Sequence, residues 1–230
     1  MGSHYNPRIV TDGLVLCLDA ANIRSYPGSG TVWTDVSGFG NDGILVNGPT
    51  YTSANGGSIV FDGTNDTVEI AGNASNNPSS MTLFCFIYPK NIRAEEIIAL
   101  NEVGDEGDGY RLMTRVYEDD TGTLWGFRPN INDLEYKGTT VLSDNTWYCL
   151  AITYTTSNLV LYLNGNVELN QSNPYALAVE NGADISIGLG VGGALRYLQA
   201  DLPIFMMYNR ALTQSEIRKN FNTFRIRFGI

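Results

Sequence analysis

The sequence predicts an all-β protein, an antiparallel two-sheet jelly-roll sandwich with one short helix near its C-terminal end. Hydrophobic residues make up 43% of the 230 residues and charged residues 17%, which supplies material for a sizeable core. Short apolar segments alternate with turn-rich segments almost throughout. The chain also holds 13 Tyr, 9 Phe and 25 Gly, a composition typical of many short strands joined by tight turns.

The expected strands are short apolar segments bounded by turn residues. They fall at residues 13–20, 58–61, 67–70, 81–88, 96–101, 110–117, 124–129, 147–154, 159–163, 185–189 and 204–208. The segments 81–88 and 147–154 are apolar at both odd and even positions. This pattern predicts strands that are buried on both faces, or that line a groove with one face.

Two segments carry hairpin signals. Residues 62–66 (Asp-Gly-Thr-Asn-Asp) separate the strands 58–61 and 67–70, and Asn164-Gly165 follows the strand 159–163. Asn-Gly is the strongest short hairpin signal in the chain, because both residues tolerate a positive φ. We therefore expect a tight antiparallel turn at each place.

One helix is expected after the last strand. Thr213 and Glu216 form a capping box, and Ile217 and Phe221 lie four residues apart on one face of a helix that runs to about Asn222. Since no Pro/Ser-rich linker or internal repeat interrupts the chain, we expect one domain. It would comprise an N-terminal arm (1–12), a sandwich (13–212), and a helix with a basic tail (213–230) that packs on the sandwich or extends from it.

Charge and residue usage exclude several classes of function. The net charge of −10 argues against a nucleic-acid partner, which requires a basic face. The single histidine, His4, lies near the N-terminus, where it is poorly placed for triad or zinc chemistry. Cys17, Cys85 and Cys149 sit in apolar segments without a CxxC motif, so we expect buried free thiols and folding in a reducing cytoplasm. No signal peptide or 18-residue apolar segment is evident, so no membrane span is expected.

An ordered set of short phrases resembles laminin-G-like (concanavalin A-like lectin/glucanase) domains, in the version encoded by tailed bacteriophages as a virion structural protein. The phrases are GLVLCLDA (13–20), SYPGSG (25–30), WTDVSG (33–38), GNDG (40–43), NGP (47–49), SIVFDG (58–63), WY (147–148), LYLNG (161–165), YNRALT (208–213) and RFG (227–229). The resemblance covers about residues 5–230. It implies two antiparallel sheets, a carbohydrate- or protein-binding surface and, in some members, a structural calcium ion.

The sequence lacks the catalytic signature of the glucanases that share this fold. Those enzymes place carboxylates on one strand with the spacing E-x-D-x-E, so that both flank the glycosidic bond. No such triplet occurs here, and the adjacent Glu95 and Glu96 would point to opposite faces of a strand. We therefore expect no catalytic residues and no enzymatic activity.

Two acidic clusters are candidates for a calcium site, because calcium takes six to eight oxygen ligands. The first contains Asp35, Ser37, Asn41 and Asp42, joined in space by Asp201, and the second contains Asp105, Glu106 and Asp108. The alternative for the first cluster is that Asp35 and Asn41 cap turns through neighbouring backbone groups.

A sugar site would combine aromatic faces with polar side chains. The candidates are Trp33, Tyr110, Arg111 and Trp125, with Arg115 and Tyr117 beside them. The alternative is core packing, since Trp and Tyr at strand positions are more often buried than exposed.

The charge is unevenly distributed along the chain. Residues 204–230 hold five basic residues and one acidic residue, a net charge of +4, so the remainder carries −14. This polarity favours a docking end for a partner. The docking candidates are Tyr5, Arg8, Arg218, Phe224, Arg225 and Arg227. The alternative is that Phe221 and Phe224 pack back on the sandwich while the arginines meet its carboxylates.

Together these features predict a non-enzymatic bacteriophage virion protein, either a capsid decoration (cement) protein or a tail-fibre-type surface module for host attachment. Its partners would be other virion proteins and further copies of itself, on the surface of a particle assembled in the host cytoplasm. The alternative is a lectin-like adhesin or receptor-binding protein that binds cell-surface glycans.

Overall fold

The computed structural model describes residues 8–91, 97–101, 110–116, 123–129, 136–172, 174, 176–177, 183–189 and 197–230. Within these residues, sixteen strands form two antiparallel sheets of eight strands each. One α-helix, α1 (Gln214–Phe224), follows the last strand, and two short 3-10 helices, η1 (Ala54–Gly56) and η2 (Arg225–Arg227), complete the fold. The expected all-β sandwich with one short C-terminal helix is confirmed.

Sheet A contains the long central strands. Its order is β14 (Asn166–Ser172), β13 (Asn158–Leu163), β12 (Tyr148–Tyr154), β7 (Met81–Pro89), β16 (Gln199–Tyr208), β5 (Ser58–Asp62) and β4 (Thr50–Thr52), and β1 (Leu14–Asp19) also pairs with β16. β5 and β1 share one edge of β16: β5 pairs with its first half and β1 with its second half. A register shift between Asp201 and Ile204 separates the two halves.

Sheet B packs against sheet A through the main core. Its order is β11 (Tyr136–Lys137), β10 (Thr123–Arg128), β9 (Tyr110–Val116), β8 (Ile97–Asn101), β15 (Ile185–Ile187), β6 (Thr67–Ile70), β3 (Gly43–Val46) and β2 (Val32–Trp33). Buried side chains from both sheets, such as Phe61 and Ile152 of sheet A and Val68 and Phe127 of sheet B, form one cluster. The sandwich is therefore held by burial of apolar area between the two layers.

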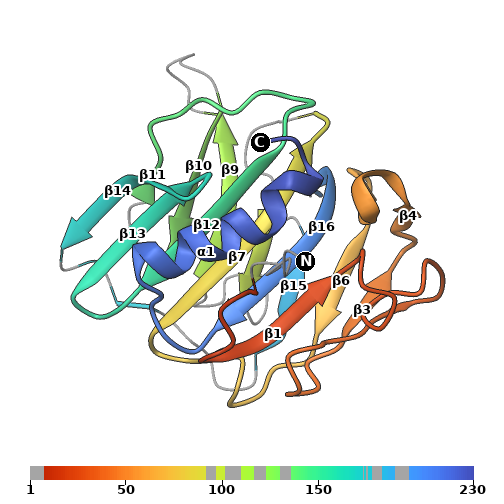
Figure 1. Cartoon of the computed structure of the whole chain (residues 1–230), viewed down its shortest axis with the longest axis horizontal. Coiled ribbons are helices and arrows are strands. Elements are labelled where there is room, and N and C mark those ends of the chain that lie inside the picture. Colours follow the sequence, from red (N-terminus) through yellow and green to blue (C-terminus); the bar gives the residue numbers. More distant parts are fainter. Residues whose placement is uncertain are drawn as a thin grey trace, which may run out of the picture.

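A second core covers the outer face of sheet A. Alternate residues of β7 divide between the two cores: Leu83 and Cys85 face the main core, whereas Phe84 and Phe86 face the second. Figure 1 shows α1 lying across this outer face, in front of β12 and β7. The prediction that the segments 81–88 and 147–154 are buried on both faces is confirmed.

Aromatic side chains of the C-terminal segment fill this second core. The Phe228 ring lies 4.7 Å from that of Phe86, and Trp147 contacts Phe228 at 4.4 Å between ring centroids. Phe224 is 8% exposed and meets Phe86 edge to face. The interpretation of the tail as a projecting docking end is thus wrong for these residues, since their burial against sheet A offers more stability than exposure to water.

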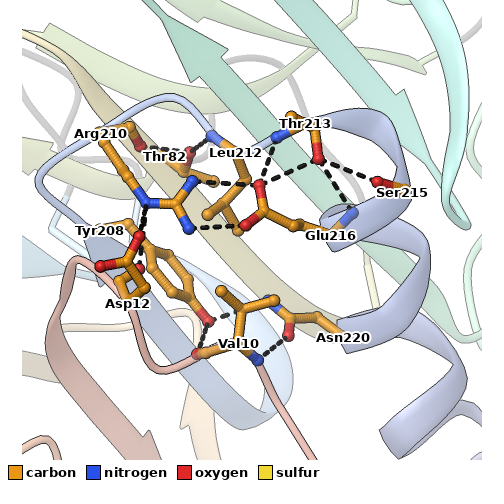
Figure 2. A network of polar contacts seen from close by, with 10 residues as sticks. All are labelled: Val10, Asp12, Thr82, Tyr208, Arg210, Leu212, Thr213, Ser215, Glu216 and Asn220. Carbon is orange, nitrogen blue, oxygen red and sulfur yellow. Dashed lines mark hydrogen bonds and ion pairs between the residues drawn. The ribbon is translucent and has the colours of Figure 1, made fainter.

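The N-terminal segment is also part of the second core. Val10 is buried, and Ile9 packs against the same cluster. The Val10 N–H donates to Asn220 Oδ1 at 2.8 Å, Asn220 Nδ2 donates to the Tyr208 hydroxyl, and that hydroxyl donates to the Val10 carbonyl. The described part of the expected arm is therefore fixed between α1 and β16 (Figure 2).

One expected hairpin differs from the structure. Residues 62–66 connect β5 in sheet A to β6 in sheet B, and the two strands do not pair with each other. Each strand presents an apolar face, which a hairpin or a crossover between layers would bury equally well. The Asn164-Gly165 hairpin is confirmed, because β13 pairs with β14 across it.

The described helices do not include a membrane-spanning one, since none is both long and apolar enough. The three cysteines are free and buried, as expected.

Candidate functional site

A pocket of about 280 Å³ lies between α1 and the β13–β14 hairpin. We call it the helix–hairpin pocket, and it is lined by Asn164, Gly165, Asn166, Arg218, Phe221, Asn222 and Arg225. Its size is near the lower end for small-molecule sites. One aromatic ring, three asparagines and two arginines therefore surround one hollow.

The hairpin side of the pocket depends on the Asn-Gly turn. Asn164 and Gly165 have φ values of 50° and 75°, as a type I′ turn requires. The Asn164 Oδ1 accepts a hydrogen bond from the Cys149 N–H at 2.8 Å, which fixes the turn to β12. A Cβ atom at Gly165 would lie 3.2 Å from the Phe221 ring. Gly165 thus allows both the turn and the close approach of the helix.

The helix side follows from residue spacing. Arg218, Asn222 and Arg225 are four and three residues apart, so they fall on one stripe of α1 and its continuation. Phe221 is half-buried, with its ring 6.1 Å from that of Phe86 and nearly parallel to it. The Arg225 guanidinium lies 5.8 Å from the centroid of the Phe221 ring, which gives a weak cation–π contact.

In the part of the chain that the structure describes, Arg218 donates hydrogen bonds only to uncharged groups, whereas Arg225 donates to the terminal carboxylate at Ile230. Arg218 Nε donates to the Gly165 carbonyl at 3.2 Å, and its Nη2 donates to Asn166 Oδ1 at 3.4 Å. Arg225 Nη1 donates to the terminal carboxylate at Ile230, at 3.2 Å. Because a guanidinium carries five N–H groups, both retain donors for a ligand.

The other flank of α1 is different, as Figure 2 shows. Arg210 donates to both carboxylate oxygens of Glu216, at 2.6 and 3.0 Å, and forms an ion pair with Asp12 at 2.9 Å. The hydrogen bonds from Arg210 lower the pKa of Glu216 from 4.5 to about 2, against the opposing effect of burial. Glu216 also closes the capping box with Thr213, which confirms the predicted start of the helix.

The first predicted metal cluster forms a network of turn-capping hydrogen bonds. Asp35 Oδ1 accepts from the N–H groups of Cys17 and Ser37, and Oδ2 accepts from the Ser37 hydroxyl and the Asn41 N–H. These four donors take all four lone-pair positions of the carboxylate. Asp42 in turn accepts from the Asp35 N–H at 2.8 Å. The arrangement does not fit a calcium ion bound through Asp35.

Asp201 does not join this cluster. It forms an ion pair with Lys90, next to the register shift in β16. Among the described residues, no three His, Cys, Asp or Glu side chains gather as a metal site. The second predicted cluster, Asp105, Glu106 and Asp108, lies outside the described residues. Calcium binding stays a prediction that this geometry does not support.

The tryptophans predicted to bind a ligand are in the core. Trp33 is 0% exposed and Trp125 is 1% exposed, and both belong to the main cluster between the sheets. The interpretation of these rings as sugar-stacking surfaces is therefore wrong, because their strand positions face inward. Tyr110 and Arg111 lie on β9, and their side chains are outside the described part, as are those of Arg115 and Tyr117.

The docking candidates separate into distinct environments. Tyr5 is outside the described residues, and Arg8 is exposed. Arg227 forms an ion pair with Asp19 at 3.0 Å, whereas Arg218 and Arg225 line the helix–hairpin pocket. Sequence reasoning missed the pocket asparagines Asn164, Asn166 and Asn222. The Asn-Gly signal located the hairpin in the sequence. Only the packing of α1 against the sheet brings the hairpin beside Arg218.

The comparisons with known proteins identify the family. The model of the concanavalin A-like lectin/glucanases superfamily matches residues 62–218, so the chain belongs to that superfamily. No curated protein sequence matches the chain.

Solved structures share the fold at low identity. Domain 4 of AbnA, a GH43 extracellular arabinanase from Geobacillus stearothermophilus, in complex with arabinotriose, has a TM-score of 0.72 at 14% identity, over 90% of this chain and 97% of that one. The binding domain of Paraclostridial Mosquitocidal Protein 1 has a TM-score of 0.71 at 19% identity, over 93% and 52%. Trypanosoma rangeli sialidase in complex with sialic acid has a TM-score of 0.69 at 16% identity, over 94% and 33%. At these identities the likeness concerns the fold.

Proposed function

We propose that this protein is a non-enzymatic, lectin-like carbohydrate-binding module, and that the helix–hairpin pocket is its binding site. The observation that carries the proposal is the composition of the pocket, in which the half-buried Phe221 is surrounded by asparagine amides and by guanidinium groups that retain free N–H donors. An aromatic edge with convergent polar groups is the usual means of orienting a small polar ligand.

The chemistry of the lining suits a sugar. A pyranose or furanose ring offers apolar C–H surface to an aromatic side chain, and its hydroxyls both donate and accept. An asparagine amide provides two donors and one accepting oxygen, which match a pair of neighbouring hydroxyls. Asn166 and Asn222 are exposed on opposite walls of the pocket, so a ring between them could contact both.

The fold neighbours support the same function. AbnA domain 4 is a nearly complete match to this chain and is seen with arabinotriose. The second neighbour is described as a binding domain, and the sialidase contains this fold as about a third of its chain. In these proteins the fold accompanies or provides a binding activity, which favours a binding module over a hydrolase.

A second candidate, a structural protein of the phage virion surface, is favoured by the thiols. Burial raises the pKa of both Cys17 and Cys85 to about 12, so these groups stay protonated and unreactive at neutral pH. A fold that needs no disulfide suits a capsid decoration or tail-fibre module made in a reducing cytoplasm. Electron microscopy of particles encoding the chain tests this: density for the sandwich on the virion surface is expected, and its absence would contradict the role.

The binding function is tested with the purified chain on a glycan array, with and without chelator, beside the double variant N166A/N222A. Reproducible binding that the variant weakens at least tenfold, and that chelator leaves unchanged, is expected. Failure to bind any glycan, or equal binding by the variant, would overturn the assignment. Incubation with β-glucans is expected to release no reducing ends, and release would contradict a non-enzymatic role.

A further inference from the structure

We infer that the helix–hairpin pocket selects acidic carbohydrates, with Arg218 and Arg225 together holding the anionic group of the sugar. This inference rests on the proposed carbohydrate-binding function and specifies its ligand class. It is carried by the placement of two guanidinium groups at one hollow that no Asp or Glu among the described residues lines, on a chain whose net charge is −10.

The local charge is opposite to that of the whole molecule. Two arginines and no acidic residue line the pocket. Glu216, the acidic residue of α1, is held by Arg210 on the other flank of the helix. Glu168 of β14 is also engaged, since its Oε2 accepts from the N–H groups of Thr139 and Thr140. An anion in the pocket would therefore meet positive charge first.

The end of α1 does not reverse this sign. The C-terminal end of a helix carries roughly half a negative charge, spread over its last carbonyl groups. The two pocket guanidinium groups carry one full positive charge each, at all pH values at which the protein is folded. After the terminal carboxylate that Arg225 contacts is subtracted, one positive charge remains, and it outweighs the helix end about twofold.

Both guanidinium groups are positioned before a ligand arrives. Arg218 is held by the Gly165 carbonyl and Asn166 Oδ1, and it uses two of its five N–H groups. Arg225 is held over the Phe221 ring and by the terminal carboxylate at Ile230. Positioning of this kind reduces the conformational entropy lost on binding. The remaining N–H groups suit a carboxylate or sulfate, which accepts paired hydrogen bonds from arginine.

The neighbouring arginines show that this arrangement is not a general property of the basic segment. Arg210 and Arg227 each meet a carboxylate of the protein, Glu216 and Asp19 respectively. Arg218 has no such partner among the described residues, and a carboxylate or sulfate of a ligand would supply one.

The test uses an array of matched acidic and neutral sugars. The probes are 3′-sialyllactose and lactose 3′-sulfate against lactose, and trigalacturonic acid against its methyl ester, with further matched pairs of the same kinds. Acidic members are expected to bind at least tenfold more tightly than their neutral partners. The sialylated and uronic acid arms distinguish carboxylate from sulfate recognition.

Variants then locate the effect. R218Q and R225Q are each expected to weaken binding of the acidic sugar about 10- to 100-fold, the range for hydrogen bonds to a charged group. K219Q is the matched control, because Lys219 is exposed on the same helix but does not line the pocket; it is expected to change binding less than threefold.

The outcomes separate the two proposals. Equal binding of neutral and acidic partners, with loss in N166A/N222A, would overturn the acidic preference and keep the binding site. A loss in K219Q as large as in R218Q would also overturn it, because the effect would then be one of net charge. Absence of binding to every sugar would overturn the carbohydrate-binding function itself.

Discussion

The two flanks of α1 use the same residue type for different purposes. On the arm flank, which comprises Asp12, Arg210, Glu216 and Asn220, every charged group has a partner of opposite sign and α1 is tied to β16 and the N-terminal segment. On the hairpin flank, which comprises Arg218, Asn222 and Arg225, Arg218 has only uncharged partners among the described residues, and Arg225 contacts the terminal carboxylate at Ile230. The first flank holds the fold together, and the second leaves charge available for a ligand.

The difference shows that net charge alone does not locate a binding surface. The C-terminal segment has a charge of +4 as a whole, but two of its arginines are neutralised within the molecule. What remains is a small positive hollow next to an aromatic ring. The predictions below test whether the two flanks differ in stability and in binding as their contacts imply, from the largest expected effect to the smallest.

Deleting the residues after Asn222 should lower the stability of the fold most, because it removes part of the second core, on which both flanks of α1 rest. Phe224 and Phe228 would leave the second core, and each buried Phe removed costs about 3–5 kcal/mol. The sum approaches the whole stability of an ordinary domain. Urea denaturation is expected to show a molecule that is largely unfolded, with F224A and F228A each intermediate. A truncated chain as stable as the full one would contradict the packing of the tail.

The variant N220A tests the arm flank. It leaves the buried Val10 N–H without its acceptor, while the Tyr208 hydroxyl loses one of its hydrogen bonds but still donates to the Val10 carbonyl. The free energy of unfolding is therefore expected to fall by about 1–3 kcal/mol. N222A on the hairpin flank is the control and is expected to change it by less than about 0.5 kcal/mol. Equal effects in urea titrations would remove the difference in stability between the flanks.

The variants R210A and R218A compare the same substitution on each side of the helix. R210A leaves Glu216 and Asp12 unpaired and is expected to cost about 1–2 kcal/mol, reduced from the buried-pair range because the groups are partly solvated. R218A is expected to change stability by less than about 0.5 kcal/mol while it abolishes most ligand binding. Thermal unfolding and calorimetric binding of both variants are expected to show the larger loss of stability in R210A and the larger loss of binding in R218A. A larger loss of stability in R218A than in R210A would contradict the prediction.

Acid should weaken the arm flank selectively. The pKa of Glu216 is lowered to about 2 in the folded state from an ordinary value of 4.5, so its contribution is complete above pH 4.5 and is lost as the pH falls from about 4.5 to about 2. The variant E216Q is expected to lose stability less steeply in this range than the natural chain. Parallel pH profiles of the unfolding midpoint would contradict the strength of the Arg210–Glu216 pair.

Calcium should have the smallest effect on stability. All four lone-pair positions of the Asp35 carboxylate already accept hydrogen bonds, and in the described part of the chain the two flanks of α1 hold no cluster of carboxylates that would bind the ion. The unfolding temperature in millimolar calcium and in chelator is expected to agree within about 1 °C. A shift of several degrees, as mass action gives for a tightly bound ion, would mean that residues outside the two flanks hold a calcium ion.

The strand pattern was readable from local sequence, but the pairing was only partly so. The segments 58–61, 67–70 and 81–88 closely match β5, β6 and β7. The turn at 62–66 was predicted as a hairpin and instead joins the two sheets, because an apolar face on each strand is satisfied by either arrangement. β2 and β11 have two residues each, too few to give a periodic signal, and β3, β4 and β14 were not predicted either.

The site residues were harder to predict for a related reason. Trp33 and Trp125 have the composition of a sugar site but the burial of a core, and a single sequence does not reveal which face of a strand is covered. Asp35 has the composition of a calcium ligand, but its neighbours' N–H groups occupy it. Arg218 and Arg225 were selected for their charge, and their pocket became visible only with the hairpin in place.

The sequence by itself determined the all-β class, the helix start at Thr213, the Asn164-Gly165 turn and the free thiols, because each depends on local periodicity, capping or turn chemistry. Only the tertiary structure decided which arginines are paired. Arg210 is six residues from Glu216, but Arg227 is 208 residues from Asp19 and Arg218 is 53 from Gly165. Such contacts are set by how the layers pack, and their charges act through space rather than along the chain.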